Sequence, residues 1–254
     1  MQLEGKTALV VGISNDIGRV TALSMANAGA KLAIADEDSV RGEAIARKIN
    51  QAGGSAFFQE TDITLNKQVS GLINRIIQEY GCLDIAFNNV NGEGPYIPLA
   101  NQPEGLVAEL INFNLNGTWM CLKHEIKQMS QQGGGAIINN VSMLKSDGKP
   151  GCSVFRSTKA AIKALTESSA VEYARNNIRV NAISPGILQK STKLAQGLRE
   201  DQESSPSSIM VPIGRPGKFQ EIANAVIWLS SDQSSYITGQ TLRIDGGINA
   251  LVAN

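Results

Sequence analysis

The stretch Val10-Val11-Gly12-Ile13-Ser14-Asn15-Asp16-Ile17-Gly18 decides the fold, because it joins an apolar strand to an amphipathic helix. A glycine-rich turn at such a junction lets backbone amides and the positive helix end approach a pyrophosphate. Aspartate at position 16 tolerates a left-handed backbone, so we expect the turn to form, although its carboxylate would repel a pyrophosphate. The residues that we predict to bind a pyrophosphate-containing cofactor are Gly12, Asn15, Asp16, Ile17 and Gly18.

Short apolar runs alternate with longer helical periods along the chain. This alternation predicts a parallel sheet with helices on both faces, and right-handed crossovers make it doubly wound. We therefore expect an α/β chain that forms a single Rossmann domain over residues 1–254, with about seven strands. The expected strands are Thr7–Val11, Lys31–Ala35, Ser55–Gln59, Leu83–Asn88, Ala136–Val141, Ile178–Ile183 and Thr241–Ile244. The expected helices are Gly18–Ala28, Val40–Ala52, Lys67–Tyr80, Leu106–Ser130, Ser153–Asn176 and Gln220–Ser230.

Asp36 ends the second expected strand, about 20 residues after the glycine-rich turn. A carboxylate at this place accepts hydrogen bonds from the adenosine ribose diol and repels a 2′-phosphate. The residue therefore favours NAD over NADP. The alternative is that Asp36 caps the helix expected to begin near Ser39.

The composition excludes several kinds of partner. The 23 basic and 23 acidic residues balance, with no basic stripe that would bind nucleic acid. There is no apolar run of about 18 residues, so no membrane span is expected, and the N-terminus has no signal-peptide layout. Three widely spaced cysteines favour a reduced, cytoplasmic protein. No metal site is predicted.

The stretch 189–208 is polar and lacks a strong apolar period. It is either a lid over a substrate site or an ordinary surface loop with a short helix. Both alternatives stay open.

The segment Ser153-Val154-Phe155-Arg156-Ser157-Thr158-Lys159 begins an expected helix, and Phe155 lies thirteen residues after Ser142. This arrangement resembles the short-chain dehydrogenase/reductase family, which places a serine after a strand and Tyr-x-x-x-Lys on the next helix. The four-residue spacing puts both side chains on one helical face. The resemblance covers nearly the whole chain, including the block from Tyr236 to Gly247.

The resemblance implies four catalytic positions. Asn114 would support a water relay, Ser142 would bind the substrate oxygen, and Lys159 would bind the nicotinamide ribose. Phe155 occupies the place of the tyrosine that passes the proton in this family, and a phenyl ring has no exchangeable proton.

The resemblance also implies further cofactor contacts. Asp62 would meet the adenine amino group, with a helix N-cap as its rival role. Asn88 follows the fourth strand, in Asn-Asn-Val-Asn where the family has Asn-Asn-Ala-Gly, and asparagine at 91 can hold a positive φ. The remaining residues implied to bind the cofactor are Ile63, Pro185, Gly186 and again Lys159.

Departures from the family pattern gather around the presumed reacting centre: Asp16, Asn91, Phe155, and Lys190 in place of a threonine for which Ser191 or Thr192 could substitute. An engineered Phe155 and natural divergence both explain the missing tyrosine, and the other departures favour divergence.

One hypothesis is an NAD-dependent oxidoreductase acting on a small alcohol or ketone, with impaired or altered proton transfer. The alternative is a catalytically inactive pseudoenzyme that binds a ligand or a partner subunit. Reduction of a C=C bond is a third possibility, which no residue supports specifically.

The resemblance implies a homo-oligomer, a tetramer or dimer, that assembles through the helices expected at Leu106–Ser130 and Ser153–Asn176.

Overall fold

The computed structural model describes residues 1–141, 150–189 and 211–251. Ser142, Lys190, Ser191, Thr192 and the expected lid, apart from Gln189, lie outside the described residues.

A single parallel sheet forms the centre of the molecule, with the strand order β3-β2-β1-β4-β5-β6-β7. The order reverses between β1 and β4, which is the topological switch point where doubly wound folds bind ligands. The expected strands are confirmed, with ends shifted by at most two residues. Their bounds are β1 Thr7–Val11, β2 Lys31–Asp36, β3 Ala56–Glu60, β4 Ile85–Asn88, β5 Gly135–Asn140, β6 Ile178–Pro185 and β7 Thr241–Ile244.

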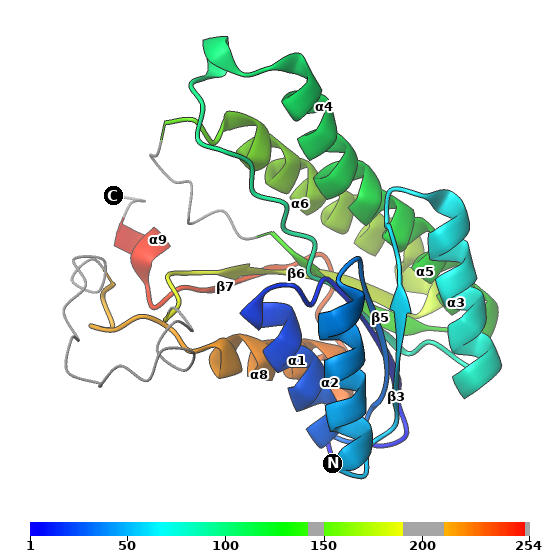
Figure 1. The fold of residues 1–254 in the computed structure, drawn as a ribbon. Coiled ribbons are helices and arrows are strands. Elements are labelled where there is room, and N and C mark those ends of the chain that lie inside the picture. Colours follow the sequence, from blue (N-terminus) through cyan, green and yellow to red (C-terminus); the bar gives the residue numbers. More distant parts are fainter. Residues whose placement is uncertain (142–149, 190–210, 252–254) are drawn as a thin grey trace.

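Helices cover both faces of the sheet (Figure 1). The first face carries α1 Asp16–Asn27, α2 Ser39–Gln51 and α8 Phe219–Ser230. The second carries α3 Asn66–Tyr80, α5 Gly117–Gln132 and α6 Ser153–Tyr173, which continues into the 3₁₀ turn η3 Ala174–Asn176. The short helices are η1 Leu99–Asn101, α4 Glu104–Ile111, η4 Asp232–Ser234 and α9 Ile248–Leu251.

Strand β1 shows why these segments form a sheet with two cores. All five of its residues are buried. Leu9 and Val11 pack into the core beneath α3 and α5, whereas Ala8 and Val10 pack into the core beneath α1 and α8. Successive side chains of a strand point to opposite faces, so a continuous apolar run is what a strand covered on both sides requires.

The helix expected at Leu106–Ser130 is interrupted. Between α4 and α5 the chain makes a π-helical turn, η2 Asn112–Asn116, in which the Gly117 amide donates to the Asn112 carbonyl. Such widened turns insert one residue into a helix and are frequent at functional sites. The apolar period cannot reveal the turn, because the helix continues on both sides of it.

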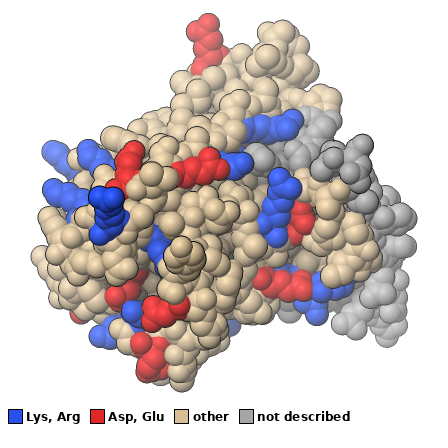
Figure 2. Space-filling model, turned by 180° about the vertical axis from the view of Figure 1, so that it is seen from behind, with Lys and Arg blue, Asp and Glu red and all other residues tan. Residues whose placement is uncertain are grey.

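The surface carries both charge signs. Basic and acidic side chains lie next to one another over much of the face in Figure 2. Within the described residues, no helix combines the length and the apolar character needed to cross a bilayer. Trp119 on α5 and Val171 on α6 are exposed apolar side chains on the helices expected to mediate self-association, which stays a prediction.

Beneath the second face, a buried polar network links two strands to two helices. The Asn88 Nδ2 donates to Glu125 Oε2 at 2.9 Å and to Asn139 Oδ1 at 3.1 Å, and Asn139 Nδ2 donates to Thr166 Oγ1 at 2.9 Å. Glu125 is fully buried, and its Oε1 has no hydrogen-bond partner among the described residues. Burial raises the pKa of this carboxyl to about 7, and the Asn88 hydrogen bond opposes the rise. Near neutral pH, Glu125 is therefore partly protonated.

We expect Glu125→Gln to alter the pH dependence of stability. A carboxyl whose folded pKa is raised stabilises the fold below its unfolded pKa, and this contribution is lost as pH rises through the folded value. Between pH 4.5 and 8, the free energy of unfolding of the native protein should fall by about 3 kcal/mol more than that of the Glu125→Gln variant. Urea unfolding at several pH values measures this difference. Glu172→Gln, at an exposed position of α6, is the control, and parallel native and Glu125→Gln curves would contradict the buried-acid interpretation.

Candidate active site

Close backbone approach explains both glycines of the turn after β1. Gly12 has φ +84°, and a Cβ there would lie 2.5 Å from the Asn89 carbonyl oxygen. A Cβ on Gly18 would collide with the Gly12 carbonyl oxygen and would lie 2.9 Å from Asn89 Nδ2. The two glycines therefore let the turn pack against the segment after β4, directly before the N-terminus of α1.

Asn89 holds this turn in place. Its Nδ2 donates to the Gly12 carbonyl at 2.7 Å and to Asn15 Oδ1 at 2.9 Å, while its Oδ1 accepts from Asn140 Nδ2 at 2.7 Å. Asn15 caps α1 by accepting from the Gly18 amide. The sequence analysis selected Asn88, whose side chain lies in the buried network, and missed Asn89 and Asn140. The tandem asparagines were the available signal, because successive residues at a strand end face opposite sides.

Asp16 does not adopt the left-handed backbone that we expected. It is the first residue of α1, and its carboxylate pairs with the Arg19 guanidinium at 2.7 Å. The expected positive φ of Asn91 is also wrong, since Asn177 is the non-glycine residue with positive φ in the described chain. Position 16 has an ordinary helical backbone conformation, which does not require glycine. The Arg19 guanidinium offsets the carboxylate charge of Asp16 that would otherwise repel a pyrophosphate.

Asp36 lies directly beside the glycine-rich turn. Its Oδ2 accepts from the Ile13 and Ser14 amides at 2.7 and 3.0 Å, and its Oδ1 accepts from the Asp38 amide at 2.9 Å. The helix-cap alternative for Asp36 is wrong, because Asp38 caps α2 by accepting from the Arg41 amide. The carboxylate thus ties the end of β2 to the turn.

Asp62 gathers with other acidic groups near Asp36. Its Oδ1 accepts from the amide and the hydroxyl of Thr64, and the N-cap of α3 is Leu65, so the cap alternative for Asp62 is wrong as well. The pKa of the Glu37 carboxyl is raised, first by burial and then by the charges of Asp62 and Asp36. Glu37 is an acidic member of this group that the sequence analysis missed.

The remaining predicted cofactor residues serve the scaffold in part. Ile63 is buried, and a Cβ on Gly117 would lie 2.7 Å from its Cδ1. Ile17 packs against the core beneath α1. Pro185 ends β6, and Gly186 lies so close to β7 that a Cβ there would be 2.5 Å from the Asp245 Cα. Their contacts with a cofactor stay predictions.

Lys159 is fully buried one helical turn after Phe155 on α6. Its Nζ donates to the Val90 carbonyl and, at 3.3 Å, to the Asn140 carbonyl, and it lies 5.3 Å from the centre of the Phe155 ring. Burial lowers the pKa of the Lys159 amine to about 7, and the negative charge of Glu93 opposes this shift. The expected shared face of positions 155 and 159 is therefore confirmed, and the amine is close to its titration point at neutral pH.

Asn114 lies in the π turn and clamps the segment after β4. Its Oδ1 accepts from the Gly92 amide at 2.9 Å, and its Nδ2 donates to the Gly92 carbonyl at 2.8 Å and to the Leu110 carbonyl at 3.0 Å. The side chain is fully buried and uses its polar atoms for these bonds. Its observed task is to fix the backbone beside Lys159, while the water relay stays a prediction.

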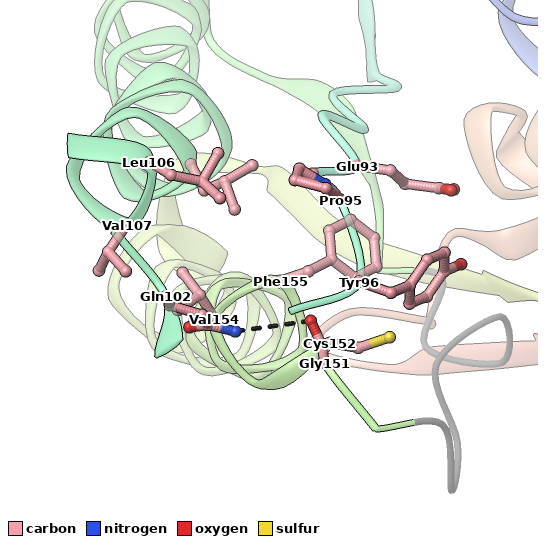
Figure 3. Close-up of a pocket in the computed structure, with 12 residues that line it drawn as sticks. Glu93, Pro95, Tyr96, Gln102, Leu106, Val107, Gly151, Cys152, Val154 and Phe155 are labelled. Atoms are coloured by element: carbon pink, nitrogen blue, oxygen red, sulfur yellow. Dashed lines mark hydrogen bonds between the residues drawn. The ribbon is translucent and has the colours of Figure 1, made fainter. Parts of the chain in front are cut away.

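Phe155 forms one wall of a pocket between α6, α4 and the segment after β4 (Figure 3). The pocket is partly open, and its volume of about 20 Å³ is room for about one water molecule. Gln102 fastens its rim, donating from Nε2 to the Ile97 carbonyl at 2.8 Å and to Ser153 Oγ at 3.1 Å. Glu93 and Tyr96 line the same pocket, and Figure 3 shows both side chains extending to one side of the Phe155 ring. Among the described residues no three His, Cys, Asp or Glu side chains group as a metal site would require.

Known proteins share this architecture over almost the whole chain. The family model described as enoyl-(acyl carrier protein) reductase matches residues 12–249. The short chain dehydrogenase/reductase astE of Aspergillus oryzae is 38% identical, over 98% of this chain and 97% of its own. The solved structure of NAD⁺-bound xylitol dehydrogenase has a TM-score of 0.87 at 32% identity, covering 97% of this chain and all of its own. Gluconate 5-dehydrogenase from Burkholderia cenocepacia, in complex with NADP and tartrate, has a TM-score of 0.87 at 28% identity, covering 98% and 97%.

We expect Gly18→Ala to destabilise the protein by ~1–3 kcal/mol, because the added methyl group meets the Gly12 carbonyl that Asn89 holds in place. The control is Gly71→Ala on α3, where a Cβ meets no atom within 4 Å. That change should stabilise the protein by up to ~1 kcal/mol through helix propensity. Urea unfolding of both variants measures the difference, and equal stabilities would contradict the tight approach at the turn.

Proposed function

Because the chain belongs to the short-chain dehydrogenase/reductase family, we propose that it transfers a hydride between NAD(H) and a small alcohol or ketone, with altered proton transfer. The observation that carries the proposal is the placement of the Lys159 amine beside the Phe155 ring. The lysine, its carbonyl partners and the glycine-rich turn support cofactor chemistry. The residue that would pass the proton is a phenylalanine.

The turn after β1 fits a dinucleotide on structural grounds. Gly12 and Gly18 let the turn pack closely against Asn89 and against itself, which places the turn at the N-terminus of α1. When bound, the nicotinamide would supply the hydride acceptor or donor. The turn amides and Arg19 would hold the pyrophosphate, and Lys159, once it exchanges a carbonyl partner, would hold the nicotinamide ribose.

The acidic group at the end of β2 supports NAD over NADP. A 2′-phosphate would face the carboxylates of Asp36, Glu37 and Asp62. The pKa of the Glu37 carboxyl is raised, first by burial and then by the charges of Asp62 and Asp36. The nearby cation, Arg41, donates to the Ser14 carbonyl and pairs with Asp38. The two solved relatives named above bind different cofactors, so the preference rests on this chain's own charges.

Phe155 determines the expected rate. Its ring lies against the lysine and carries no proton, and loss of a positioned acid or base costs about 10²–10⁴-fold in turnover. Alcohol oxidation should therefore be slow unless another group accepts the proton. The relatives' names, xylitol dehydrogenase and gluconate 5-dehydrogenase, support hydroxyl compounds as the substrate class.

We expect NADH to bind the purified protein in the micromolar range and NADPH to bind at least about tenfold more weakly, measured by calorimetry. Glu37→Gln should reduce the ratio of the NADPH to the NADH dissociation constant, because it removes one carboxylate and keeps the Asp36 hydrogen bonds to the turn. Glu43→Gln, exposed on α2, is the control. Absence of binding at millimolar NADH would favour the alternative, a catalytically inactive subunit that binds another ligand or a partner.

We expect Phe155→Tyr to raise the rate of alcohol oxidation at least about tenfold in steady-state assays with NAD⁺, because the phenol supplies the missing acid or base. The adjoining cavity of about 20 Å³ leaves room for the added hydroxyl group. Phe155→Leu, which adds no proton, is the control. An unchanged rate on a substrate that the native chain oxidises would mean that the proton leaves by another route.

A further inference from the structure

The segment that follows β4 is held firmly against the start of α6. Asn114 bonds both backbone groups of Gly92, and a Cβ on Gly94 would lie 2.9 Å from a Leu110 methyl group. A Cβ on Gly151 would lie 2.6 Å from the Ile97 amide nitrogen and from the Tyr96 carbonyl carbon. Glu93 is therefore carried on a fixed backbone, although its side chain is exposed.

Glu93 lies where its charge reaches the reacting centre. Its side chain lines the same pocket as the Phe155 ring (Figure 3). Its carboxylate is the group whose charge raises the pKa of the Lys159 amine against the effect of burial. Asn91 Nδ2 donates to Glu93 Oε1 at 3.1 Å, which orients the carboxylate. Asn91 and Glu93 thus form a pair beside the position that lacks a proton carrier.

Resting on the proposed function, we propose that Glu93 is the general base that accepts the substrate hydroxyl proton in place of the absent tyrosine. The hydroxyl O–H bond breaks and its proton moves to a Glu93 carboxylate oxygen. The O–H electron pair forms the carbonyl π bond as the carbinol C–H pair leaves as hydride to the oxidised nicotinamide. Glu93 then releases the proton to water, and ketone reduction reverses each transfer.

Two other groups near the pocket are poorer carriers. Lys159 is fully buried, and its amine is held by the Val90 and Asn140 carbonyls under the Phe155 ring. Tyr96 carries a hydroxyl on the pocket rim, but a phenol must first lose its own proton to act as a base, whereas the Glu93 carboxylate already carries the charge that acts on Lys159. An exposed carboxylate beside the pocket can also return its proton directly to solvent.

The first experiment measures alcohol oxidation by the Glu93→Gln variant. Turnover should fall by about 10²–10⁴-fold with KM changed by less than about threefold, while NADH binding by calorimetry stays native. Glu109→Gln, exposed on α4 and outside the pocket, should keep native turnover. Adding Phe155→Tyr to Glu93→Gln should restore the lost turnover, because the phenol supplies a second carrier.

A second measurement needs neither cofactor nor turnover. The Lys159 amine can be titrated by NMR of ¹³C-labelled lysine, with Lys159→Met assigning its signal. Glu93→Gln should lower the pKa of Lys159 further, because the opposing negative charge is gone, whereas Glu109→Gln should leave it in place.

The outcomes separate the two proposals. Native turnover in Glu93→Gln, loss of turnover in Tyr96→Phe alone, or an unmoved Lys159 titration would overturn the role of Glu93. Those results would leave the proposed function standing, whereas a native chain that binds NADH and oxidises no alcohol, when Phe155→Tyr does, would overturn both proposals. Absence of NADH binding by the native chain would likewise remove the proposed function, and the role of Glu93 with it.

Discussion

The close approach of the first turn to the end of β4 is the constraint on which the rest of the site depends. Gly12 can meet the Asn89 carbonyl only without a side chain, and Asn89 then bonds the turn on one side and Asn140 on the other. Three parallel strands therefore end in fixed relation to one another. This junction fixes the positions of the start of α1, the segment after β4 and Lys159.

The alternation of apolar runs and helical periods predicted the sheet and the helices around it, because strands buried on both faces are continuously apolar. Side-chain partners were harder to predict. Asn88 and Asn89 are the same residue type at neighbouring positions. Because they face opposite sides of the strand end, Asn88 joins the buried polar network and Asn89 bonds the turn. The cap roles of Asp36 and Asp62 failed because neither residue directly precedes its helix, and Asp38 and Leu65 occupy the N-cap positions instead.

The buried lysine of α6 is held by groups from other parts of the chain. Lys159, Asn140 and Val90 form a connected set in which a buried amine finds its hydrogen bonds in backbone carbonyls. Beside this amine lies the apolar ring of Phe155, where the resemblance to the family implies a tyrosine. Burial alone would favour the neutral amine, and the carboxylate on the neighbouring segment works in the opposite direction. The charge of the lysine therefore depends on residues from two separate parts of the chain.

The π turn at Asn112–Asn116 has a consequence for how this helix can vary. Deleting one residue there would restore a regular helix and rotate everything after it by about 100°. The apolar stripe of α5, which carries Leu122, Ile126 and Met129, would then face away from the sheet. The widened turn thus sets the rotation of α5 about its axis relative to α4. Insertions or deletions in this stretch should therefore be far less tolerated than substitutions.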